Sequence, residues 1–113
     1  MRLRAALVAA ALLCQPALAQ DRGTRIAMAV ALLDVAEDHC AGHFSVDAGV
    51  KETLMAHFHE YDIAGLASLL SQPLNAFYED FAYEAKREPE AFCRRAPREA
   101  AATGYPVILA AAP

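Results

Sequence analysis

The chain has four histidines within a short stretch, and imidazole nitrogens are frequent ligands of zinc and copper. They are His39, His43, His57 and His59. His39 and His43 are four residues apart, a spacing that puts two side chains on the same face of a helix. His57 and His59 are two apart, so on a helix they point to nearly opposite sides and only one can join a common site. The spacing therefore predicts, as an alternative function, a copper or zinc site made by His39, His43 and one of the other two.

The same histidines also have ordinary structural interpretations. A protonated His39 near the end of a helix is stabilised by the helix dipole, and His43 falls in a loop. His57 and His59 flank an apolar position on a predicted helix. Met55, four residues before His59, would add a soft ligand that suits copper. Because the histidines can be explained without a metal, metal binding is the second hypothesis and not the first.

Residues for nucleophilic catalysis are few. The serines after the first 20 residues are Ser45, Ser68 and Ser71, and none lies in a G-x-S-x-G motif. Cys40 and His43 form a nucleophile–base pair only if the thiol is free, which conflicts with an exported, oxidised chain. Acid–base catalysis needs two carboxyls in a shared pocket, a property that spacing alone does not indicate. The sequence indicates no reaction and favours a non-enzymatic role.

The first 19 residues are typical of a secretory signal peptide. Arg2 and Arg4 form a basic start, residues 5–13 an apolar run, and Ala17 and Ala19 the small residues of a cleavage site. Nine apolar residues are too few to span a bilayer, which takes about 20. We predict cleavage after Ala19 and a periplasmic or secreted protein with no membrane span in the mature chain.

One of the three cysteines, Cys14, lies within the predicted signal. Leu13 before it does not match a lipid-attachment motif, which takes a small residue there. Cleavage leaves Cys40 and Cys93, and an even number of cysteines in an exported chain favours a disulfide. Across 53 residues, the chain-entropy model gives such a bridge a stabilisation of about 4 kcal/mol. Neither cysteine lies in a C-x-x-C pair, which disfavours a redox or metal-binding thiol.

Composition limits the partners. The formal charge of the chain is −4, and loss of the two signal arginines makes it −6. This charge opposes attraction to nucleic acid, so we interpret the bases of the C-terminal half as a salt-bridged face. They are Lys86, Arg87, Arg94, Arg95 and Arg98. Residues 20–113 contain no repeat or linker and suffice for a single domain.

Alanine is frequent and glycine scarce in the mature chain, which favours helices almost throughout. We expect a first helix over 24–40, ended by Gly42, and a second that Ser45 or Asp47 caps and that runs to about Glu60. The apolar stripe of the second helix comprises Val46, Val50, Leu54, Phe58 and Tyr61. This spacing of three and four is typical of a helix that buries one face.

Two further helices are expected on either side of a proline. Asp62 can cap a helix over 63–70, and Ser71-Gln72-Pro73 predicts an interruption because proline restricts the preceding residue and suits a first helical turn. A fourth helix then spans 73–87. Its core face comprises Leu74, Phe77, Phe81 and Ala85, with Tyr83 on the exposed side.

A fifth segment begins at Glu88-Pro89, is broken or kinked by Pro97 and ends at Gly104. The predicted fold is therefore all-α: a small bundle of four to five helices stapled by a Cys40–Cys93 disulfide. That bridge brings the end of the first helix beside the start of the last. It would place the acids Asp34, Glu37 and Asp38 near the bases Arg94, Arg95 and Arg98.

The C-terminal tail, residues 105–113, is apolar and carries no charge. It either folds back over the bundle or offers an apolar segment to a partner, and residues 105–109 have the one strand-like pattern of the mature chain. The candidate partner-binding residues are Tyr105, Val107, Ile108 and Leu109.

In size, export, helicity and its single long-range disulfide, the mature chain resembles the small periplasmic acid-stress chaperones. The resemblance is one of architecture and carries over no functional residue. Together with the apolar tail, it favours a non-enzymatic interaction protein of the periplasm: a chaperone, an assembly factor or a regulatory subunit. Periplasmic copper or zinc binding through the histidines is the alternative.

Overall fold

The computed structural model describes residues 22–63 and 67–111. The elements in chain order are α2 (Arg22–His39), β1 (Phe44–Val46), α3 (Ala48–Ile63), α4 (Ala67–Arg87), α5 (Pro89–Ala102) and β2 (Ile108–Ala110). The predicted signal peptide lies outside the described residues. The fold is mostly helical, as predicted, with one small sheet. None of the described helices is both long enough and apolar enough to cross a membrane.

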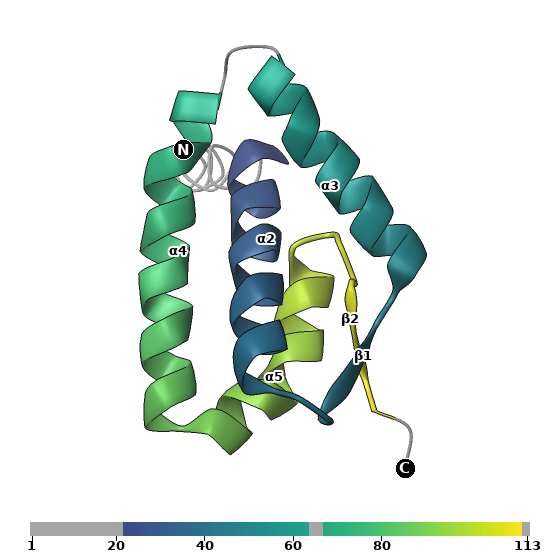
Figure 1. The fold of residues 1–113 in the computed structure, drawn as a ribbon, viewed down its shortest axis with the longest axis vertical. Helices are drawn as coiled ribbons and strands as arrows, with labels where there is room; N and C mark the ends of the chain where they lie inside the picture. The colour runs from purple at the N-terminus through teal and green to yellow at the C-terminus, as the bar shows by residue number, and fades with distance from the viewer. Residues whose placement is uncertain (1–21, 64–66, 112–113) are drawn as a thin grey trace, which may run out of the picture.

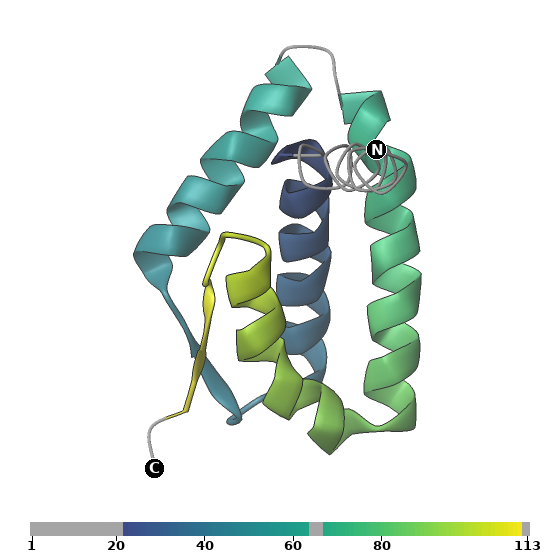
Figure 2. The ribbon, with the colours of Figure 1, turned by 180° about the vertical axis from the view of Figure 1, so that it is seen from behind.

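Helix α2 is the centre of the bundle. It lies between α3 and α4 (Figure 1), and α5 packs against its other side, as the view from behind shows (Figure 2). Because neighbours surround it, α2 is apolar around most of its circumference rather than along one stripe. Its buried residues are Ile26, Ala27, Ala29, Val30, Ala31, Leu32, Leu33, Val35 and Ala36. The alanines let the backbones of neighbouring helices approach α2 closely.

The predicted apolar stripes of the second and fourth helices are confirmed. On α3, Leu54 is fully buried, and Val50, Phe58 and Tyr61 pack against the core while partly buried. Val46, which was expected to begin this stripe, lies in β1 and not on the helix. On α4, Phe81 and Ala85 are buried in the same core. The ring of Phe81 lies 6.1 Å from that of Phe92, so this contact joins α4 to α5.

The predicted interruption at Pro73 is wrong. Helix α4 runs unbroken from Ala67 to Arg87 with Pro73 inside it, and α3 continues to Ile63. A proline in a helix interior removes one backbone hydrogen bond and crowds the preceding turn. Leu70, before the proline, is buried, and Leu74, after it, packs partly buried against the core; burial on both sides favours a continuous helix despite the local cost. Pro97 likewise lies inside α5 and does not end it.

A two-stranded antiparallel sheet joins the segment between α2 and α3 to the C-terminal tail, and only its second strand was expected from the sequence. The register pairs Phe44 with Ala110, Ser45 with Leu109 and Val46 with Ile108. The Asp47 N–H donates to the Val107 carbonyl at 2.8 Å, which extends the pairing by one residue. The tail therefore folds back over the bundle.

The predicted disulfide is present. Cys40 follows α2 and Cys93 lies in α5, with their Cα atoms 5.5 Å apart and a sequence separation of 53. Both residues are buried, at 0% and 2% exposure. The bridge ties the end of the central helix to the start of the last one.

Candidate functional site

The structure does not bring the four histidines together. His39 ends α2, His43 lies in the following turn, and His57 and His59 lie on α3. Three of the four are exposed, and His57 is partly buried. Among the described residues, no three His, Cys, Asp or Glu side chains are grouped to hold a metal ion. This arrangement does not favour the predicted copper or zinc site, which stays a prediction.

His57 instead bonds to the C-terminal tail. Its Nδ1 is 2.7 Å from the hydroxyl of Tyr105, and the two rings meet edge to face with centroids 5.7 Å apart. Tyr105 is therefore partly buried, whereas Tyr83, which was expected on the exposed side of its helix, is 64% exposed. The contact fastens α3 to the residues that follow α5.

This pair lines a groove of about 560 Å³, which we call the α2–α3 groove. It lies between the first turn of α2, the first half of α3 and the turn that follows α5. The lining residues are Arg22, Arg25, Asp47, Gly49, Val50, Thr53, His57, Thr103, Gly104, Tyr105 and Pro106. Its volume falls within the range of small-molecule sites, about 300–1,000 Å³.

The charges in the α2–α3 groove differ in how they are engaged. Arg22 forms an ion pair with Glu60 at 3.2 Å, whereas Arg25 is exposed and makes no hydrogen bond or ion pair within the described part of the chain. Asp47, the single acid of the lining, caps α3 because its Oδ1 accepts from the Val50 N–H at 3.1 Å. The Arg25 guanidinium thus has no partner among the described residues of the groove.

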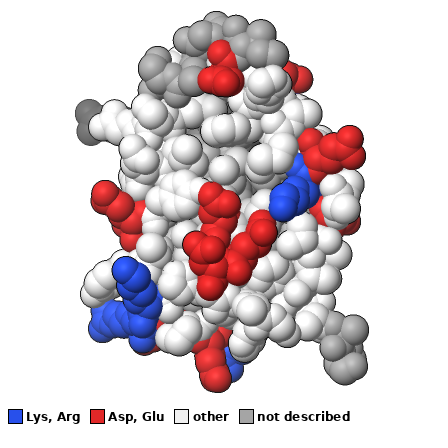
Figure 3. Space-filling model, in the orientation of Figure 1, with Lys and Arg blue, Asp and Glu red and all other residues white. Residues whose placement is uncertain are grey.

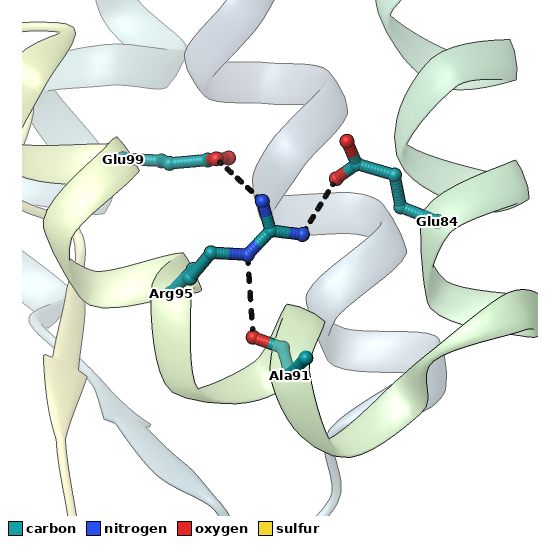
Figure 4. Close-up of polar contacts among 4 residues, drawn as sticks. All are labelled: Glu84, Ala91, Arg95 and Glu99. Carbon is teal, nitrogen blue, oxygen red and sulfur yellow. Dashed lines mark hydrogen bonds and ion pairs between the residues drawn. The ribbon is translucent and has the colours of Figure 1, made fainter.

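A second groove, between the end of α4 and the start of α5, is larger, about 720 Å³, and is lined mostly by charged residues. Arg95 crosses it between two carboxylates (Figure 4), at 3.1 Å from Glu84 and 3.9 Å from Glu99. Burial raises the pKa of Glu99, Glu84 raises it further, and Arg95 opposes the shift. Arg87, on the same rim, donates to the Tyr83 hydroxyl at 3.4 Å. The basic residues of this groove, Arg87 and Arg95, already bond to other side chains of the protein, so few donors remain for a ligand.

The acids Asp34, Glu37 and Asp38 were expected to lie near Arg94, Arg95 and Arg98, but no ion pair joins the two sets among the described residues. Glu37 pairs with Lys51 of α3 at 3.4 Å, and Arg95 pairs with the acids just described. Burial raises the pKa of Asp34, and the neighbouring carboxylates of Glu37 and Asp38 raise it further, against Lys51. Acidic side chains gather in the middle of the face shown in Figure 3, with basic ones at separate places around them.

The tail residues predicted to bind a partner differ in accessibility. Val107 and Ile108, at the point where the tail enters β2, are buried at 0% and 1% exposure because they pack in the core cluster. They are core residues here and are not available to a partner in this fold. Leu109 is 40% exposed and points to the opposite face from Ile108. Of the four predicted residues, Leu109 is exposed and Tyr105 lies partly buried in the groove.

Sequence reasoning missed the α2–α3 groove. Its two arginines, three residues apart at the start of the first helix, carried no motif. Their relation to Val50 and Tyr105 exists only after the tail has folded back. Comparison of the chain with protein-family models, curated proteins and solved structures finds no significant match.

Proposed function

We propose that this chain is a small exported protein that binds a protein partner in the periplasm, as a chaperone, an assembly factor or a regulatory subunit, and catalyses no reaction. Export is supported by the signal-like start of the sequence. It is further supported by the buried Cys40–Cys93 disulfide, since such bonds persist in oxidising compartments. With residues 1–19 removed, both remaining cysteines are used in that bond.

The observation that carries the binding role is Leu109, a large apolar side chain held 40% exposed on the outer face of the sheet. It lies opposite Ser45, which is also exposed. The buried Val107 and Ile108 hold the tail in place, so the outer face of the sheet is rigid. Little conformational entropy is therefore lost when a partner binds to this face.

The edge of β1 adds backbone groups to this surface. Asp47 and Val107 form a hydrogen-bonded pair, because the Asp47 N–H donates to the Val107 carbonyl. Along an antiparallel ladder, such pairs alternate with pairs whose backbone N–H and C=O groups point away from the neighbouring strand. Phe44 and Val46 therefore direct their N–H and C=O groups away from β2. No described residue bonds to these groups. An extended apolar segment of a partner can add here as a further strand.

A pull-down from a native periplasmic extract tests the role. Tagged protein is produced by an exporting host. Its intact mass reports cleavage after Ala19 and the loss of two hydrogen atoms on disulfide formation. We expect a stoichiometric protein partner in the eluate of the wild type and its loss from the Leu109→Glu variant.

Leu69→Glu is the matched control, because Leu69 is a leucine that is 64% exposed near the start of α4, far from the sheet. It should retain the partner. Absence of any stoichiometric partner, or equal loss from both variants, would contradict the proposal. An unprocessed N-terminus would contradict export separately.

A further inference from the structure

We propose that the α2–α3 groove is a binding site for a small-molecule monocarboxylate with an apolar body, such as a medium-chain fatty acid. This site goes beyond the partner-binding role, since it shares no residue with the surface around Leu109. Its volume of about 560 Å³ is ample for an acyl chain of eight to ten carbons.

Charge selects the anion. Among the described residues that line the groove, Arg25 is exposed without a partner, and the single carboxylate, Asp47, already accepts from the Val50 N–H. A guanidinium offers a planar pair of donors that matches a carboxylate. The mature chain is acidic, so the positive charge of Arg25 in the α2–α3 groove is a local exception to the overall charge.

The walls of the groove select the apolar body. Val50, Pro106 and the ring of Tyr105 line it together with Gly49 and Gly104, which add no side chain. The hydroxyl of Tyr105 is engaged by His57, so it does not demand a polar partner from the ligand. Within the described ranges, the one unpaired guanidinium of the lining, beside an apolar wall, fits a ligand with one negative charge and a hydrocarbon chain, not a phosphate or a sugar.

The wall formed by the C-terminal turn is built before any ligand arrives. The Thr103 hydroxyl donates to the Ala100 carbonyl at 2.6 Å and accepts from the Tyr105 N–H at 3.2 Å. Thr103 itself is 2% exposed. Gly104 adopts φ +86°, a left-handed conformation that glycine takes without strain. A preformed wall loses little entropy on binding, which favours affinity.

Isothermal titration calorimetry of the exported protein with octanoate tests the site, with octylammonium as the probe of equal length and opposite charge. We expect one saturable octanoate site and no octylammonium binding. Arg25→Gln should weaken octanoate binding roughly tenfold, the effect of losing one charge-assisted hydrogen bond. Arg25→Glu should abolish octanoate binding and create octylammonium binding.

Arg98→Gln and Arg98→Glu are the matched controls, because Arg98 is an exposed arginine outside the groove. Both should bind octanoate as the wild type does. The proposal is overturned if the wild type binds no octanoate, if it binds both probes equally, or if the Arg98 and Arg25 variants lose affinity alike. These outcomes are independent of the pull-down, so each proposal can fail alone.

Discussion

His57 and Tyr105 are joined by a hydrogen bond of 2.7 Å that spans 48 residues of sequence and holds the C-terminal turn against α3. Tyr105→Phe keeps the ring and removes the bond. We expect it to lower the free energy of unfolding by about 0.5–1.5 kcal/mol, the usual net value of such a bond, in urea denaturation. Tyr83→Phe is the control, because the Tyr83 hydroxyl is exposed and accepts one long bond from Arg87. Equal effects of the two substitutions would show that the bond contributes nothing specific.

Removal of the disulfide should destabilise the domain strongly. Cys40→Ser and Cys93→Ser each open a covalent loop of 53 residues and leave a hydroxyl in a buried site. We expect each to cost about 2–5 kcal/mol in chemical denaturation. The double variant should cost about as much as either single one, because the first substitution already removes the shared interaction. Additive losses would mean that the two side chains act separately and that the bridge itself contributes little.

The predictable parts of the fold are those indicated by the spacing of nearby residues or by the number of cysteines. Val50, Leu54 and Phe58 follow one another at four-residue spacing, which indicates a helix face wherever that face is buried. Cys40 and Cys93 could pair only with each other once Cys14 was assigned to the signal. Gly42 has φ +84° after the first helix, as its predicted role as a helix stop requires.

What the sequence could not show depends on contacts between distant segments. β1 has only three residues, and its pairing with β2 is decided across more than 60 residues of chain. Pro73 lies inside α4, although proline by itself favours an interruption of the helix. The α2–α3 groove likewise needs three segments at once: Arg25 from α2, Val50 from α3 and Tyr105 from the tail. No spacing within any one segment indicates it.

The raised pKa of Asp34 gives a testable pH dependence. Its proton is held more tightly in the folded chain, so the resulting stability is fully present below the ordinary pKa of 3.8 and is lost as the pH rises through the raised value. Asp34→Asn imitates the protonated form. We expect it to raise the free energy of unfolding at pH 7, and with it the melting temperature. The gain should be less than about 1 kcal/mol because water screens this side chain.

The gain from Asp34→Asn should shrink as the pH falls below that ordinary value, because the wild-type side chain is then protonated in both states. Asp62→Asn serves as the control, since Asp62 is exposed near the other end of the bundle, close to the end of α3. Thermal melts of the three proteins between pH 3 and pH 7 measure the difference. A gain from Asp34→Asn that does not change with pH would contradict an electrostatic origin.

Pro73→Ala should stabilise the protein, whereas Pro89→Ala should not. Pro73 lies inside α4, where alanine restores a backbone donor and relieves crowding. The loss of partly buried proline surface and the greater freedom of the unfolded chain oppose this gain, so we expect a net increase of about 1–2 kcal/mol. Pro89 begins α5, a position that suits proline, and its replacement should cost up to about 1 kcal/mol. Urea denaturation of both variants decides between the alternatives: a loss of stability in Pro73→Ala would mean that packing of the ring itself, and not the helix faces beside it, holds α4 continuous.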